Sequence, residues 1–203
     1  MEEIRSSTVL PGIREDIELH TRDSETLVGE LSVPAAGKPV TTLIMLHPLP
    51  THGGFMDSHL IRKAANRLPA LIGAAVLRFN TRGTTSPRGT SSGHFSDGVA
   101  ESEDVAAAVK FCLDRGLPTP WLIGWSFGTE LAIKYGPDLN IMGAILLSPP
   151  LHRATDGDLL RWNEFGRPLI ALVPELDEYL DPEAASERFA IVDHAEVFGF
   201  DQE

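Results

Sequence analysis

Cysteine, long apolar runs and basic residues are all scarce in this chain of 203 residues. Cys112 is the only cysteine, so the chain can form neither an internal disulfide nor a multi-cysteine metal site. No uninterrupted apolar stretch reaches the roughly 18 residues that span a bilayer, and the first residues lack the basic and apolar regions of a signal peptide. These absences predict a cytoplasmic protein in a reducing compartment.

The shortage of positive charge bears on the kinds of partner. Lys and Arg number 17 against 29 Asp and Glu, which gives a formal net charge of −12. Such a surface repels phosphate backbones and anionic lipid, so the sequence predicts neither a nucleic-acid partner nor a membrane partner. Hydrophobic residues at 42% and charged residues at 23% are typical of a globular chain. The length predicts a single domain over residues 1–203, and the short connection 149–167 predicts that this domain has no large lid.

Apolar runs alternate with helical patterns along the chain, and this alternation predicts an α/β fold. A polar turn joins two short strands near the start, which predicts an N-terminal antiparallel hairpin. The later strand-helix units predict a doubly wound, mostly parallel sheet of eight strands. The expected strands are 17–21, 26–33, 40–47, 74–79, 121–125, 143–148, 169–173 and 195–200, and the expected helices are 57–68, 96–115, 127–135 and 182–189, with one or two helical turns around 159–162.

The motif that carries most chemistry is Gly-Trp-Ser-Phe-Gly over residues 124–128, between an expected strand and an expected helix. A serine at such a tight turn adopts strained backbone angles and exposes its hydroxyl at the carboxyl edge of the sheet. The first N–H groups of the following helix point at the reacting centre, where they can stabilise an oxyanion. The motif predicts that Ser126 is a nucleophile and that Phe127 N–H is an oxyanion donor. The alternative is a serine that caps an ordinary helix.

Three further segments occur in order on the expected elements: His-Pro-Leu-Pro at 47–50, Gly-Gly-Phe-Met-Asp at 53–57 and Arg-Phe-Asn-Thr-Arg-Gly at 78–83. With the serine motif they resemble the HPxP, GGxMD and RFNxRG blocks of the α/β-hydrolase superfamily, and most closely its compact, lidless, dienelactone-hydrolase-like group. The resemblance covers roughly residues 25–200. It implies the α/β-hydrolase fold and a serine hydrolase mechanism, and leaves the substrate open.

The loop after the third strand supplies the second oxyanion donor in this fold. Pro48 and Pro50 have no N–H, so Leu49 is the donor nearest to the strand end and is predicted to act with Phe127. The preceding His47 is expected to have a structural role, hydrogen-bonded beneath the loop.

The acid of the catalytic triad is expected in the loop after the strand 169–173. Asp177 matches the position that the resemblance implies, and Asp181 and Glu175 are rivals in the same acidic segment. In the triad Asp177 would orient a histidine and stabilise its charged form. The alternative is a solvated loop carboxylate.

The general-base histidine is the missing part of this triad. The resemblance implies a histidine after the last strand, but only Asp201, Gln202 and Glu203 follow it here, and the closing helix is absent too. His194 precedes that strand, and at roughly 3.3 Å per residue it would lie about 20 Å from Ser126. The favoured explanation is that the natural protein continues beyond Glu203. The others are a substitute, His52, His94 or His152, and a protein without full catalytic power.

Other candidate sites are weaker. The Gly-, Ser- and Thr-rich segment 81–98 is expected to be a surface loop, with a mobile flap or an anion site as alternatives. Four potential ligands, His47, His52, Asp57 and His59, lack the spacing of a metal site, and no cofactor is expected.

The sequence as a whole predicts a serine hydrolase that cleaves a small ester or related acyl compound through an acyl-enzyme. The alternative is a catalytically incomplete hydrolase-fold protein that binds a ligand or partner. Neither the oligomeric state nor the choice among ester, thioester, lactone and peptide follows from the sequence.

Overall fold

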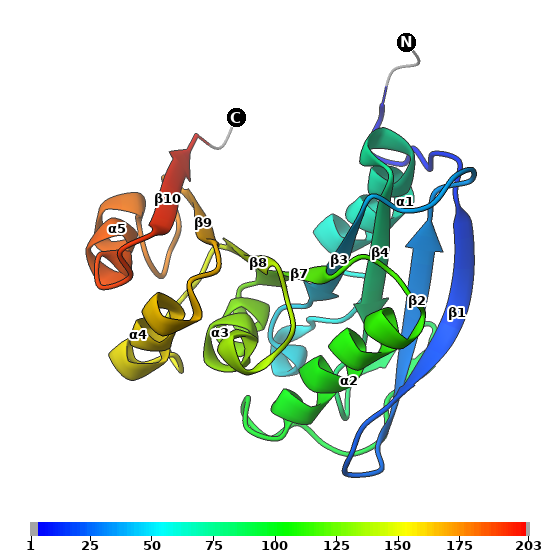
Figure 1. Ribbon diagram of the computed structural model, residues 1–203, viewed down its shortest axis with the longest axis horizontal. Helices are drawn as coiled ribbons and strands as arrows, with labels where there is room; N and C mark the ends of the chain where they lie inside the picture. The colour runs from blue at the N-terminus through cyan, green and yellow to red at the C-terminus, as the bar shows by residue number, and fades with distance from the viewer. Residues whose placement is uncertain (1–3, 202–203) are drawn as a thin grey trace.

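The computed structural model describes residues 4–201 as a twisted eight-stranded sheet with helices on both faces (Figure 1). The strands lie in the order β1-β2-β4-β3-β7-β8-β9-β10. β2 runs antiparallel to both of its neighbours, and every pair from β4 to β10 is parallel, which confirms the predicted fold class. The strands of this sheet are β1 (Ile13–His20), β2 (Thr26–Val33), β3 (Thr41–Leu46), β4 (Ala74–Phe79), β7 (Pro120–Trp125), β8 (Gly143–Leu147), β9 (Leu169–Pro174) and β10 (Ala195–Phe200).

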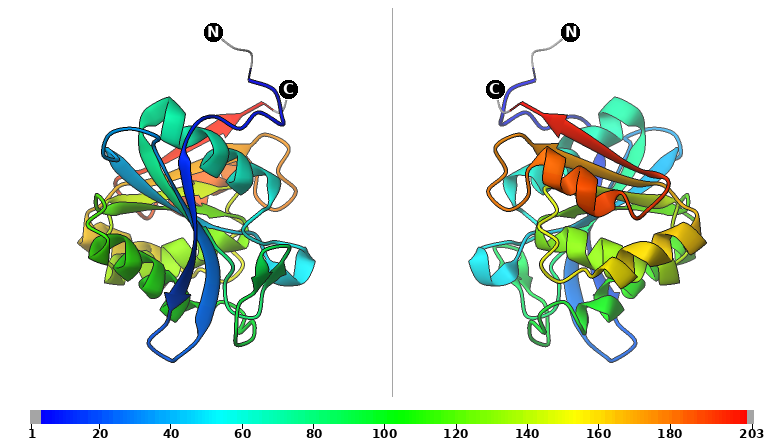
Figure 2. Two further views of the ribbon diagram at one scale, coloured as in Figure 1. Left: turned by 90° about the vertical axis from the view of Figure 1, so that its right-hand side faces the viewer. Right: turned by 90° about the vertical axis from the view of Figure 1, so that its left-hand side faces the viewer.

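Helices cover both faces of the sheet (Figure 2), and an apolar core lies on each face. The larger core lies beneath α2, α3, α4 and α5, and the smaller core lies beneath α1. All six residues of β4 are buried, which explains why this strand shows no polar-apolar alternation. Within residues 4–201 no helix is long and apolar enough to cross a bilayer. The α-helices are α1 (His59–Ile72), α2 (Glu101–Asp114), α3 (Phe127–Tyr135), α4 (Asp156–Phe165) and α5 (Pro182–Phe189), and short 3-10 turns lie at η1 (Pro50–His52) and η2 (Gly136–Asp138).

Helix α2 begins at Glu101, five residues later than the pattern predicts. The buried carboxylate of Glu101 accepts hydrogen bonds from the backbone N–H groups of Ser96 and Gly98, at 2.8 and 2.9 Å. These bonds hold residues 96–100 in a turn, and Val99, expected on the buried stripe, is 65% exposed. The hydrogen bonds to Glu101 therefore delay the start of α2, although the apolar pattern predicts a helix from residue 96.

Other elements differ from the prediction as well: β1 begins at Ile13 instead of residue 17, and α1 ends at Ile72 instead of residue 68. Helix α4 has ten residues instead of one or two turns, because Thr155 and Asp158 form a reciprocal capping box at its start. A two-stranded hairpin of β5 (Thr85–Ser86) and β6 (Gly89–Thr90) lies inside the segment 81–98, which the sequence predicts to be a loop.

The last strand leaves apolar surface open on the face of the sheet that carries α1. The β10 side chains of Phe198 and Phe200 are 49% and 46% exposed. The described residues end at Asp201, directly after β10.

Candidate active site

Ser126 occupies the sharp turn between β7 and α3, with backbone angles φ 51° and ψ −115°. A positive φ is strained for a residue with a side chain, so surrounding contacts must hold it. Ser126 N–H donates to Leu147 O at 2.9 Å, and Ser126 O accepts from both the N–H and the hydroxyl of Thr129, at 2.9 and 2.6 Å. This geometry is what a nucleophile elbow requires.

The two glycines of the motif are explained by close packing of backbone on backbone. A Cβ added to Gly124 would lie 2.5 Å from the carbonyl oxygen of Gly128. A Cβ added to Gly128 would lie 2.1 Å from the carbonyl oxygen of Leu46, at the end of β3. Both distances are shorter than any real Cβ contact, so the elbow needs glycine on each side of the serine.

A pocket of about 320 Å³ opens beside Ser126. It brings together three of the residues predicted from the sequence, namely Ser126, Leu49 and Phe127, although they come from separate segments. The full lining consists of Pro48, Leu49, His52, Ser126, Phe127, Pro150, His152, Arg153 and Tyr179.

The two expected oxyanion donors occupy suitable positions on this pocket. Phe127 is the first residue of α3, so its N–H has no carbonyl partner within the helix. Leu49 precedes the turn η1, and its carbonyl accepts from the N–H groups of His52 and Gly54, both at 3.0 Å. Within residues 4–201 the N–H of Leu49 donates no hydrogen bond. Both N–H groups can therefore receive a developing oxyanion.

His47 is buried beneath this loop and has the structural position that the sequence predicts. Its Nε2 accepts from Thr81 N–H at 3.1 Å, which requires the neutral ring to carry its proton on Nδ1. Nδ1 then donates to Pro48 O at 2.7 Å. Burial lowers the pKa of His47 to about 4. A neutral imidazole thus links the expected oxyanion loop to the segment after β4.

Asp177 lies half-buried in the loop after β9 and is not among the residues that line the pocket. Its Oδ1 accepts from the N–H groups of Tyr179 and Leu180 at 2.9 and 3.2 Å, and Oδ2 is not used in these bonds. The Tyr179 ring packs edge-on against the ring of His152, with centroids 5.3 Å apart. Asp177 is therefore two residues along the chain from Tyr179, which lines the pocket.

The rival carboxylates have other partners. Asp181 caps α5 by accepting from Ala184 N–H at 2.8 Å. Glu175 is exposed and hydrogen-bonds Asp201, and this contact between two carboxyl groups raises the pKa of Glu175. Asp177 makes neither of these contacts, and its role as the acid stays a prediction.

The histidines fall into two groups by position. His52 and His152 line the Ser126 pocket, whereas His94 does not. His194 donates through Nε2 to Arg167 O at 2.8 Å and precedes β10, which runs parallel to β9. His194 consequently lies at the amino edge of the sheet, opposite to Ser126, as predicted. The expected position of the general base, after β10, lies outside the described residues.

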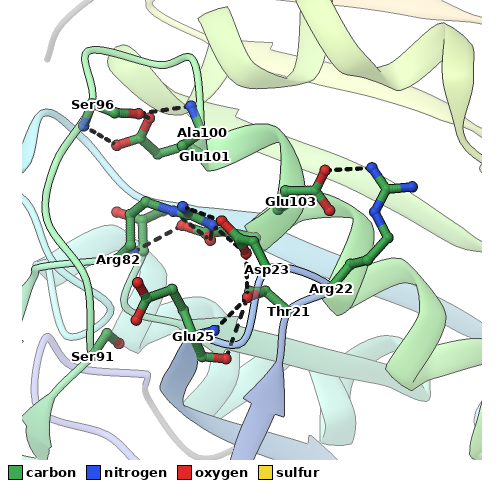
Figure 3. Close-up of polar contacts among 12 residues, drawn as sticks. Thr21, Arg22, Asp23, Glu25, Arg82, Ser91, Ser96, Ala100, Glu101 and Glu103 are labelled. Atoms are coloured by element: carbon green, nitrogen blue, oxygen red, sulfur yellow. Dashed lines mark hydrogen bonds and ion pairs between the residues drawn. The ribbon is translucent and has the colours of Figure 1, made fainter.

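The segment 81–98 is anchored at both ends by buried charges (Figure 3). Arg82 donates to the carboxylates of Asp104 and Asp23, with distances of 2.8 to 3.1 Å. Burial raises the pKa of Asp104 to about 6 against the opposing bonds from Arg82, while the Arg82 and Thr21 hydrogen bonds lower the pKa of Asp23 to about 2. At the other end the Glu101 carboxylate accepts hydrogen bonds from the N–H and the hydroxyl of Ser96, so both ends of the segment are held in place.

Two further features bear on ligand binding. In residues 4–201 no group of three or more His, Cys, Asp or Glu side chains is placed to hold a metal ion. A larger hollow of about 700 Å³ lies between β1, α2 and α3, away from Ser126. Its Arg22 and Glu103 side chains pair with each other at 2.6 Å.

Sequence reasoning missed two residues that shape the pocket. Arg153 lines it with its guanidinium 5.3 Å from the centre of the Phe127 ring. Glu130 is fully buried in α3, one turn after Ser126. The sequence shows an acidic residue beside the apolar run 131–133, but nothing in it indicates the partners of Glu130.

Comparison with known proteins agrees with this geometry. Residues 43–200 match the model of the alpha/beta hydrolase family. A lidless α/β serine hydrolase from Xanthomonas campestris has 25% sequence identity and a TM-score of 0.76, and the match covers 97% of this chain and 87% of that one. A serine hydrolase homologue from Coxiella burnetii has 23% identity and a TM-score of 0.78, with 92% and 86% of the two chains covered. An esterase from Pyrococcus furiosus has 20% identity and a TM-score of 0.78, with 94% and 82% covered.

No curated protein resembles the chain closely enough to count as a match. The family model nevertheless spans well over half of the chain, and the strand order and the serine turn agree with the resemblance drawn from the sequence blocks. The narrower dienelactone-hydrolase-like group stays a prediction. The chain belongs to the alpha/beta hydrolase family.

Proposed function

We propose that this hydrolase is a serine hydrolase that cleaves a small ester or related acyl compound through an acyl-enzyme. The observation that carries the proposal is the strained turn of Ser126, which lies on one pocket with Leu49 and Phe127. Backbone strain at a non-glycine residue costs free energy and persists where the surrounding structure maintains it for a function.

In the first half of the reaction Ser126 Oγ attacks the substrate carbonyl while a histidine accepts the hydroxyl proton. The N–H groups of Leu49 and Phe127 donate to the oxyanion of the tetrahedral intermediate. The C–O bond to the leaving alcohol then breaks, and the histidine returns its proton to that oxygen. Asp177 orients the imidazole and stabilises its charged form without taking the proton.

In the second half a water attacks the acyl-enzyme and gives one proton to the histidine. The bond to Ser126 Oγ breaks, the serine recovers that proton, and the carboxylic acid leaves. His52 and His152 are the histidines that line the pocket. They are the candidates for the proton acceptor within the described residues.

The size of the pocket supports a small acyl substrate. A volume of about 320 Å³ is at the lower end of the range for small-molecule sites. Only residues 148–155 connect β8 to α4, which is too short for a lid domain. The related Pyrococcus furiosus protein is described as an esterase, and this supports ester cleavage here.

Labelling with a fluorophosphonate tests the proposal, because the reagent reacts with activated serines. We expect labelling of the wild-type chain and none of the Ser126→Ala variant. Ser148→Ala is the matched control, since Ser148 also has a positive φ, 49°, at the end of the neighbouring strand but does not line the pocket. A panel of p-nitrophenyl esters then measures acyl preference. Labelling that does not depend on Ser126 would refute the enzyme proposal in favour of a ligand- or partner-binding protein.

A further inference from the structure

Glu130 presents an unusual buried carboxylate close to the proposed nucleophile. It belongs to α3, one turn after Ser126, and its side chain is fully buried. No ion pair of Glu130 occurs among the described residues, although a buried carboxylate requires compensation for its lost hydration. The compensation comes from backbone N–H groups.

Three consecutive N–H groups converge on this carboxylate. Oε1 accepts from His152 N–H at 2.6 Å and from Arg153 N–H at 3.1 Å. Oε2 accepts from Arg153 N–H at 3.1 Å and from Ala154 N–H at 2.6 Å. Such charge-assisted bonds are shorter and stronger than bonds between neutral groups. Glu130 therefore clamps the backbone of residues 152–154 to the helix that begins beside Ser126.

The clamped residues form one wall of the candidate active site. His152 and Arg153 both line the Ser126 pocket. The same connection contains two non-glycine residues with φ 49°, Ser148 and Leu151. Strained angles persist only where other contacts determine the backbone, and the bonds to Glu130 begin directly after Leu151.

A carboxylate is the only side-chain group of this size that suits the arrangement. Each of its two oxygens accepts bonds from the loop, whereas the amide of a glutamine has one acceptor and would point an NH₂ donor at the N–H groups. The Asp97 carboxylate further holds the Arg153 side chain, at 2.6 and 2.9 Å, so backbone and side chain of this wall are each tied to a separate anion.

We propose that Glu130 is a positioning residue of the active site, which fixes the His152–Arg153 wall at its distance from Ser126 and so sets the affinity for the acyl compound. This inference rests on the proposed function, because it concerns binding to the same pocket. Glu130 acts through the backbone of the wall and touches no reacting atom.

Labelling kinetics of Glu130→Gln provide the test. The labelling rate is measured up to saturating fluorophosphonate concentrations, which gives KI, the concentration at half-maximal rate, and the maximal labelling rate. We expect KI to rise about tenfold, because a mobile wall weakens binding of the reagent. The maximal labelling rate should change less than about threefold. Asp158→Asn is the matched control: it also replaces a carboxylate that accepts from a backbone N–H, that of Thr155, yet contacts no pocket residue. We expect both of its constants to stay within about twofold of wild type.

If Glu130 only stabilised the fold, its replacement would leave KI unchanged. Partial unfolding would lower the amount of labelled protein at an unchanged KI, so a Glu130→Gln variant with unchanged KI would overturn the proposal. If Glu130→Gln does not fold, KI is measured for Glu130→Asp, which keeps the charge on a shorter side chain. An unchanged KI of that variant would again overturn the proposal.

Hydrogen exchange separates this inference from the proposed function, because it needs no reactive serine. In the Ser126→Ala background we expect the amides of residues 152–154 to exchange at least about tenfold faster after Glu130→Gln, with the amides of β8 unchanged. If Ser126 proves unreactive but this difference appears, the clamp stands and the hydrolase proposal falls. If labelling depends on Ser126 but the amides exchange equally, the clamp is refuted alone.

Discussion

Replacing Gly128 by alanine is expected to damage both the stability and the reactivity of this protein. The new Cβ would lie 2.1 Å from the carbonyl oxygen of Leu46 and 2.6 Å from its carbonyl carbon. Both are backbone atoms of β3, so no side chain can rotate away. To restore a normal contact, α3 and β3 must separate by about 1 Å, and overpacking of this kind costs about 3 kcal/mol.

The same displacement bears on the chemistry, because Leu46 is followed by the loop of Leu49 and Gly128 is two residues from Ser126. A misplacement of about 1 Å between a nucleophile and the groups that assist it can lower a rate about 100-fold. We therefore expect the urea midpoint of Gly128→Ala to fall clearly, and its fluorophosphonate labelling to fall about 100-fold in buffer where the variant is still folded.

Gly157→Ala is the control for this experiment. Gly157 lies in the first turn of α4, and the nearest atom to its added Cβ is the Thr155 hydroxyl at 3.6 Å, an ordinary contact. Alanine favours a helix over glycine by up to about 1 kcal/mol, so this variant should be equally or more stable and label normally. A Gly128→Ala protein that unfolds and labels like wild type would refute the argument from backbone packing.

The remaining predictions concern buried charge and the position of the histidines. His47 has a folded-state pKa of about 4, below the ordinary value of 6.5, so the unfolded chain binds more protons between these pH values and stability falls as pH drops through this range, by about 3 kcal/mol. Urea unfolding at pH 7 and pH 4 checks this, and His47→Gln should lack that part of the pH dependence. Arg82→Met should cost about 3 kcal/mol, because it leaves the buried Asp104 without its cation. Arg22→Met, in an exposed pair, should leave the urea midpoint unchanged, and equal midpoints for the two variants would contradict the reasoning. His194→Ala should label within about twofold of wild type, since the side chain lies at the opposite edge of the sheet; a loss of more than about tenfold would show that this placement is wrong.

The sheet could be predicted closely because its signals are local. Continuous apolar runs marked the buried strands, and all eight expected strands occur in the structure. Two of the boundaries that were wrong involve side chains that bond backbone a few residues away: Glu101 delays α2, and the Thr155–Asp158 box extends α4. Periodicity alone does not detect such bonds, although the Thr-x-x-Asp pattern was available at α4.

The candidate site could be predicted only in part. Ser126 and Phe127 follow from one motif, and Leu49 follows from the two prolines beside it, so all three were accessible. Glu130 was not, because its partners at 152–154 lie at least 22 residues away along the chain and are backbone groups without a sequence signature. The sequence predicts Asp177 as the acid with Asp181 as a rival, and only the tertiary structure shows that Asp181 caps α5.

The sequence by itself determined the order of strands and helices and the serine turn, because hydrophobic periodicity and the steric needs of a tight turn are properties of neighbouring residues. Only the tertiary structure decided which distant groups meet around the serine. The 47–49 loop, the Glu130 clamp and the Arg82–Asp104 pair each join separate segments whose distance depends on how the layers pack. The physical reason is that a buried charge or N–H group must find a partner, and the partner nearest in space need not be near in sequence.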